Sequence, residues 1–274
     1  MPDLFQYEFM RNAFITGVLV SIACGIVGTL VVVNKLSFLA GGVAHAAYGG
    51  LGLATFLGIS PVNGIIPFAL GSSLLMGVVS RRNKERSDTV IGVMWAAGMA
   101  IGIILIDLKP GYYVDLMSYL FGSIMAVSLQ NIFLMLLLDA IIISCVLFLY
   151  KEILGISYDE EYASISGVPA RILYYIILML IALTVIMLIQ AVGLIMVIAL
   201  FTLPASIAEL FTKDLKRMML VSSVLGMFFT IIGLFISYCF NLTAGASIVL
   251  SACAGYGMAV LLKKTVLTTD YSRS

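Results

Sequence analysis

Charged side chains are scarce in this sequence. Asp, Glu, Lys and Arg together make up 11% of the 274 residues, whereas soluble domains average roughly 25%. Hydrophobic residues account for 62%, which is typical of a chain that crosses a membrane several times. The net charge of +1 leaves no basic face for nucleic acid. The composition predicts an all-α, polytopic membrane helix bundle with a single domain over residues 1–274.

Several groups that define familiar sites are also missing. The four cysteines stand singly in apolar runs without a C-x-x-C spacing, which favours buried small side chains over disulfides or a zinc cluster. No G-x-x-x-x-G-K-[ST] loop is present to cradle nucleotide phosphates. The chain has one histidine, so imidazoles cannot cluster within one subunit. We therefore expect a protein that is not an enzyme by itself and holds no permanently bound cofactor.

Apolar runs of span length fill most of the chain. The run 172–209 is nearly twice as long as a bilayer core at about 1.5 Å per residue, so it must hold two spans, with a break at 190–193. The piece 116–127 is too short to cross and predicts a partial or re-entrant helix. The sequence predicts eight or nine spans, at residues 12–33, 36–58, 60–79, 89–107, 131–150, two within 172–209, 218–238 and 245–262.

Basic residues mark the loops that face the cytoplasm. They lie in the stretch 81–88, at 213–217 and at 263–264. The positive-inside rule places all of these on the cytoplasmic side. With nine crossings, the N-terminus is then outside and the C-terminus inside.

The largest concentration of acidic residues is the connection 157–169, between the fifth and sixth predicted spans. A short helix fits there, because Gly167 and Pro169 would end it. Ala163 would leave room for the close approach of a partner. The alternative interpretation is a solvated acidic loop with a helix stop.

His45 lies inside the second apolar run, among many glycines. An ionisable group within the membrane is a candidate functional residue, and a neutral imidazole binds zinc, manganese or iron. The glycines predict either backbone crowding or local unwinding around it. The alternative is a buried histidine that is hydrogen-bonded to a carbonyl freed by a kink in this segment.

Other residues are candidates for the same pathway. Asp139, inside the fifth span, is a second candidate metal ligand, or else a protonated or hydrogen-bonded side chain at a helix interface. Asp115 and Tyr48 are assigned to the outer mouth or gate, where negative charge would attract cations, although loop acids are often merely solvated. Pro204 interrupts a helical hydrogen-bond ladder and predicts a hinge.

Seven segments stand in one order along the chain. They are 34–38 with 44–46, 88–93, 115–124, 159–168, 190–193, 203–205 and 245–250. Together they resemble the permease of zinc/manganese-type ABC importers, and the resemblance covers nearly the whole chain.

That resemblance implies a type II importer-like permease in the bacterial cytoplasmic (inner) membrane. The partners it implies are a second copy of the permease, a cytoplasmic ABC ATPase dimer and an extracellular or periplasmic metal-binding protein. Glu160, Glu161, Ala163 and Gly167 lie in a stretch similar to the Glu-Ala-Ala-x-x-x-Gly loop of ABC-importer permeases. The resemblance therefore implies that a coupling helix at about 157–169 docks into the ATPase.

The sequence departs from this family one helical turn before His45. Related permeases often carry an aspartate there, but this chain has Gly41, and Gly42 does not replace the acid. Either another acid supplies the negative charge or the pathway binds ions weakly.

We expect a permease for a divalent cation, zinc ahead of manganese and ferrous iron, that works by ATP-driven alternating access. An ATP-independent secondary transporter or channel would need no ATPase. A permease for a metal chelate would have a wide cavity and more spans. A membrane enzyme is disfavoured, because no H-E-x-x-H type of spacing occurs.

Overall fold

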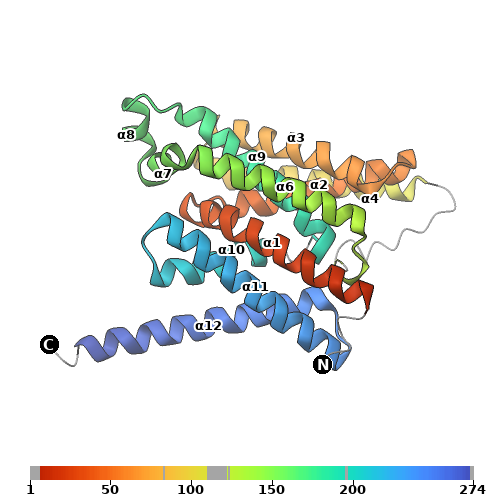
Figure 1. The fold of residues 1–274 in the computed structure, drawn as a ribbon. Coiled ribbons are helices and arrows are strands. Elements are labelled where there is room, and N and C mark those ends of the chain that lie inside the picture. The colour runs from red at the N-terminus through yellow and green to blue at the C-terminus, as the bar shows by residue number, and fades with distance from the viewer. Residues whose placement is uncertain (1–6, 83, 110–121, 123, 195–196, 272–274) are drawn as a thin grey trace.

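The computed structural model describes residues 7–82, 84–109, 122, 124–194 and 197–271. They form a helix bundle, with short 3₁₀ turns at Lys84–Arg86 and Ile124–Ala126 (Figure 1). In chain order the α-helices are α1 (Glu8–Val33), α2 (Ser37–Leu57), α3 (Pro61–Arg82), α4 (Ser87–Asp107), α6 (Leu129–Phe148), α7 (Tyr150–Tyr158), α8 (Glu160–Ile165), α9 (Ala170–Val192), α10 (Val197–Phe211), α11 (Leu215–Phe240) and α12 (Ala244–Tyr271).

Seven helices within these ranges are long and apolar enough to cross a membrane: α1, α3, α4, α6, α9, α11 and α12. Helix α2 has 21 residues, but its glycines and His45 lower its hydropathy. Helix α10 has only 15 residues. These seven candidate spans are fewer than the eight or nine that the sequence predicts, and α2 and α10 are two further apolar helices of the bundle.

Helix α1 begins and helix α12 ends at opposite ends of the bundle. Figure 1 shows the start of α1 at one end and the end of α12 at the other. Helices α7 and α8 lie at the same end as the end of α12. This is the arrangement expected for nine crossings, and it brings the predicted cytoplasmic connection 157–169 to the same end as the end of α12.

Small residues allow α1 to pack closely against two neighbours. A Cβ added at Gly25 would lie 2.4 Å from the Cα of Ser223 in α11. A Cβ at Gly28 would lie 2.3 Å from the carbonyl oxygen of Phe201 in α10. Small residues at helix interfaces are the usual route to close packing in membranes, where lipid offers no hydrophobic driving force.

The predicted break in the long apolar run is confirmed. Helix α9 ends at Val192, and Gly193 follows with φ 79° and ψ 171°, a backbone conformation that is essentially restricted to glycine. Most of the predicted partial helix at 116–127 lies outside the described residues. Its described part contains one 3₁₀ turn, Ile124–Ala126.

Candidate functional site

Helix α2 is clamped between α3 and α4 by glycines. A Cβ at Gly50 of α2 would lie 2.3 Å from the carbonyl oxygen of Gly64 in α3. A Cβ at Gly102 of α4 would lie 2.6 Å from the carbonyl oxygen of Tyr48 in α2. Helix α2 runs unbroken over Ser37–Leu57. Of the two outcomes that the glycines predicted, the structure shows backbone crowding rather than unwinding.

His45 sits in the middle of this clamp and is 9% exposed. Its Nδ1 atom is buried and meets no hydrogen-bond partner among the residues that the structure describes. Leaving a buried polar atom unpaired costs about 1–3 kcal/mol, so such an atom needs an explanation. The alternative of a histidine that is hydrogen-bonded to a kinked backbone is not what the structure shows.

The imidazole of His45 lies flat against the indole of Trp95 in α4. The ring centroids are 4.1 Å apart and the ring planes differ by 9°. The indole is itself anchored, because its Nε1–H donates to Sδ of Met99 at 3.1 Å. Sequence reasoning missed Trp95. The available signal was that the chain's only tryptophan stands inside a span, away from the interfaces where tryptophan is enriched.

The space that an acid would occupy one turn before His45 is filled. A Cβ at Gly41 would lie 2.5 Å from Cδ1 of Ile198 in α10. An aspartate at this position would therefore have to displace the isoleucine side chain. The missing carboxylate is replaced by an apolar contact between α2 and α10.

Asp139, the second candidate ligand, lies elsewhere in the bundle. It is 4% exposed, and within the described ranges neither of its carboxylate oxygens has a hydrogen-bond partner. Its helix α6 packs mainly against α1 and α9, whereas α2 packs mainly against α3 and α4. A search of the described residues also finds no group of three or more His, Cys, Asp or Glu side chains that could hold a metal ion.

The other predicted pathway residues have different surroundings. Asp115 lies outside the described residues. Tyr48 is 2% exposed and packs against Gly102 in the clamp between α2 and α4. Pro204 is buried in α10, which is helical on both sides of it.

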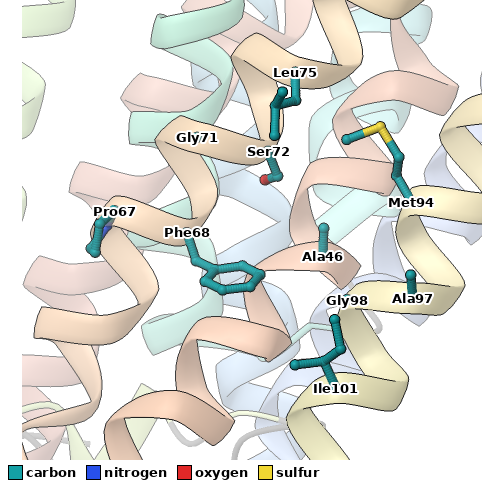
Figure 2. A pocket seen from close by; sticks show the side chains of 10 residues that line it. All are labelled: Ala46, Pro67, Phe68, Gly71, Ser72, Leu75, Met94, Ala97, Gly98 and Ile101. Carbon is teal, nitrogen blue, oxygen red and sulfur yellow. The ribbon is translucent and has the colours of Figure 1, made fainter.

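An apolar groove opens between α3 and α4, with Ala46 at its floor (Figure 2). Its volume is about 310 Å³, and Phe68 and Met94 form part of its two walls. The hydroxyl of Ser72 also faces the groove, but it donates to the carbonyl of Ala69 within α3. This lining offers a cation no strong ligand, so we do not place the ion path in the groove.

The predicted short helix in the acidic connection is present as α8. The Asp159 carboxylate accepts a hydrogen bond from the N–H of Tyr162 at 2.9 Å and so caps its start. At its end the N–H of Val168 donates to the carbonyl of Ala163 at 3.0 Å, and Gly167 has φ 87°. This is the glycine-terminated arrangement that satisfies the last carbonyls of a helix.

Side chains on α8 face in different directions. Glu160 forms an ion pair with Arg81 at the end of α3, and the guanidinium of Arg81 lies 4.8 Å from the ring centroid of Tyr174 in α9. Glu161 is exposed, whereas Ala163 is buried. Ala163 faces helix α7 of the same chain, because a Cβ added at Gly155 of α7 would lie 3.7 Å from the Cβ of Ala163.

Helix α7, which precedes α8, is tied to two more connections at this end of the bundle. The side-chain amide of Asn34, between α1 and α2, donates to the hydroxyl of Ser157 at 3.1 Å. The hydroxyl of Tyr158 donates to the carbonyl of Lys213, between α10 and α11, at 3.0 Å. The pair α7–α8 therefore contacts the ends of α1, α3 and α10 together.

Comparison with known proteins places this architecture in a family. A model described as the ABC 3 transport family matches residues 6–263. The chain is 50% identical over 264 residues to a membrane protein of Synechocystis, covering 96% of this chain and 94% of that protein. It is 34% identical over 261 residues to the manganese transport system membrane protein MntC of Listeria monocytogenes, covering 95% and 93% of the two chains.

A solved structure agrees with these matches. PsaBC from Streptococcus pneumoniae, determined in complex with a Fab, superposes with a TM-score of 0.85 at 33% identity, covering 94% of this chain and 93% of that chain. The agreement extends over nearly the full length of both chains. The chain therefore belongs to the ABC 3 transport family, in which it is a membrane permease subunit.

Proposed function

We propose that this permease carries a divalent metal cation across the bacterial cytoplasmic membrane in an ATP-driven importer. Family members with similar sequences, such as MntC of Listeria monocytogenes, are named for manganese transport. We therefore place manganese ahead of zinc, in the reverse of the order expected from the sequence. The permease would act as a homodimer with two cytoplasmic ATPase subunits, and an extracellular metal-binding protein would deliver the ion.

The observation that carries this proposal is the unpaired Nδ1 atom of His45, buried on a helix in the centre of the bundle. A neutral imidazole nitrogen is a ligand for first-row divalent metals. One imidazole without a neighbouring carboxylate makes a weak site. Weak binding suits transport, because the ion must leave the site as readily as it enters.

Two features of helix α8 support a role in connecting an ATPase with this site. Its exposed residue Glu161 faces away from the chain, where a partner can contact it. Its other acid, Glu160, is paired with Arg81 at the end of α3. Helix α3 in turn packs against α2 through Gly64 and Gly50, and α2 carries His45.

The mechanism that follows is alternating access. Closure of the ATPases on ATP displaces α8, and the ion pair with Arg81 passes this displacement to α3. Because α2 is clamped to α3 and α4 by backbone contacts, the three helices move as one body. Rocking of that body exposes His45 first to the outside and then to the cytoplasm.

Uptake of manganese into proteoliposomes that contain the permease and its ATPase tests this proposal. We expect uptake with ATP and none with a non-hydrolysable analogue. Undiminished uptake without ATP hydrolysis would contradict the proposal and favour a secondary transporter or channel. Uptake of a chelated metal in preference to the free ion would favour a permease for a metal chelate.

A further inference from the structure

The chain's only histidine and its only tryptophan lie face to face in the membrane interior. Their ring centroids are 4.1 Å apart and their planes are tilted by 9°. Neither residue is within the cytoplasmic connections that the transport mechanism invokes. Offset or parallel aromatic pairs contribute about 0.5–1.5 kcal/mol beyond the area that they bury, so this contact restrains both rings.

Two further contacts hold the stacked rings of His45 and Trp95 in place. Trp95 is fixed on α4, because its Nε1–H donates to Sδ of Met99 at 3.1 Å. The backbones beside the two rings are also fixed, because a Cβ at Gly98 would lie 2.7 Å from the Cα of Ala46, the residue after His45. The relative position of the two helices is therefore set within one turn of the stack, and the indole blocks rotation of the imidazole out of this plane.

The orientation of the ring matters more here than in a site with several ligands. Gly41 supplies no carboxylate, and Ile198 fills the space that an aspartate side chain there would occupy. A metal ion binds imidazole in the plane of the ring, along the lone pair of a nitrogen. A residue stacked on the face of the ring does not occupy that direction, and the buried, unpaired Nδ1 of His45 lies in this plane.

We propose that Trp95 is a positioning residue of the cation site, whose indole holds the His45 imidazole in the orientation that presents Nδ1 to the passing divalent cation. This inference rests on the proposed function. Trp95 touches the imidazole and not the ion. It lowers the entropy that the imidazole loses on binding, and that loss is about 0.5–1.5 kcal/mol for an immobilised side chain.

Transport kinetics separate this role from plain packing. Trp95→Leu keeps an apolar side chain of substantial volume but removes the aromatic plane, and Trp95→Phe keeps a plane. We expect Trp95→Leu to raise KM for manganese about 3- to 10-fold with kcat nearly unchanged, and Trp95→Phe to restore most of the loss. Phe228→Ala is the matched control, because Phe228 is an exposed aromatic residue of α11, far from this stack in sequence.

A second measurement does not depend on a Trp95 variant folding. The full-length permease in lipid nanodiscs has a single tryptophan, so its emission reports on this site. Paramagnetic Mn²⁺ bound at His45 should quench that emission saturably, while Mg²⁺, which prefers oxygen ligands, should not. The saturable quenching should disappear in His45→Ala.

The outcomes distinguish the inference from the proposed function. If wild type transports manganese but Trp95→Leu leaves KM unchanged, or if Trp95→Phe and Trp95→Leu lose equally, the positioning role is wrong and the transport proposal stands. If wild type transports but Mn²⁺ quenches wild type and His45→Ala alike, the positioning role is also wrong. If wild type shows neither ATP-dependent uptake nor saturable quenching, both are wrong.

Discussion

Helix α2 and helix α8 are held in place by different kinds of interaction. Helix α2 meets α3 and α4 through direct backbone contacts at Gly50 and Gly102. Helix α8 is held by a polar cap at Asp159 and by the ion pair of Glu160 with Arg81, whose side chains are 49% and 28% exposed.

This difference indicates which region moves and which stays rigid. Close backbone packing has few alternative arrangements, so the helices around His45 keep their mutual positions. Partly exposed ion pairs contribute less than close backbone packing and tolerate small changes of geometry, so α8 has more freedom to move than the helices around His45 while its pair with Arg81 keeps it linked to α3. Coupling in this permease would then consist of a displacement of α8, held by polar contacts, that acts on the rigid body formed by α2, α3 and α4.

The largest expected effect is on the rigid body. Gly102→Leu would place the new Cβ 2.6 Å from the carbonyl oxygen of Tyr48. Because backbone atoms cannot move aside as a side chain can, we expect the loss of folding free energy to exceed the about 1–3 kcal/mol of ordinary overpacking. We expect loss of monodisperse protein in size-exclusion chromatography. Gly92→Leu on the same helix is the control, because a Cβ there meets no described atom within 4 Å. Equal yields of the two variants would contradict the close backbone packing of α2 against α4 at Gly102.

The next effect concerns the acid that the site lacks. We expect Gly41→Asp combined with Ile198→Ala to lower KM for manganese at least about tenfold, because a carboxylate about 4 Å from a divalent cation contributes ~2 kcal/mol even with the screening of water. Turnover should fall as release slows. Uptake kinetics of the double variant are compared with Ile198→Ala alone. An unchanged KM would show that position 41 does not face the ion path.

A smaller effect is expected at the ion pair between Glu160 of α8 and Arg81 of α3. Arg81→Ala removes the ion pair that links α8 to α3. Partly exposed ion pairs contribute up to about 1 kcal/mol. We therefore expect the number of ions transported per ATP hydrolysed to fall by a factor of about 2 to 5. Arg82→Ala is the control, because Arg82 is the exposed neighbour in the same helix. If the two variants behave alike, force does not pass through Arg81.

The smallest effect is expected at Asp139. Asp139→Asn keeps the size of the side chain, and α6 packs mainly outside the clamped body of α2, α3 and α4. Manganese uptake should therefore stay within about twofold of wild type, since the substitution leaves the proposed ligand untouched. A loss as large as that of a His45 variant would place Asp139 on the ion path.

Local signals made much of the fold predictable. Gly193 ends α9 because its backbone conformation suits glycine alone, and Gly167 ends α8 with a left-handed residue in the same way. Both features depend on residues close in sequence. The seven candidate spans leave out α2, because this helix is so rich in glycine that its hydropathy falls short although it lies in the centre of the bundle.

The candidate site was only half predictable. The sequence makes His45 a candidate because an intramembrane histidine is rare, but it does not point to the neighbouring Trp95. The stack depends on the register between α2 and α4, which the contact of Gly98 with Ala46 sets. Neither helix encodes that register by itself, so the sequence offers no local pattern from which the pair could be read.

The most direct test of a cation path past His45 is metal-stimulated ATPase activity of the reconstituted complex, measured together with manganese uptake for wild type and His45→Ala. We expect His45→Ala to assemble with its ATPase and keep basal hydrolysis, while metal stimulation and uptake fall at least about tenfold, equivalent to ~1.4 kcal/mol. Normal uptake by His45→Ala would mean that His45 is a structural residue and not a ligand of the ion.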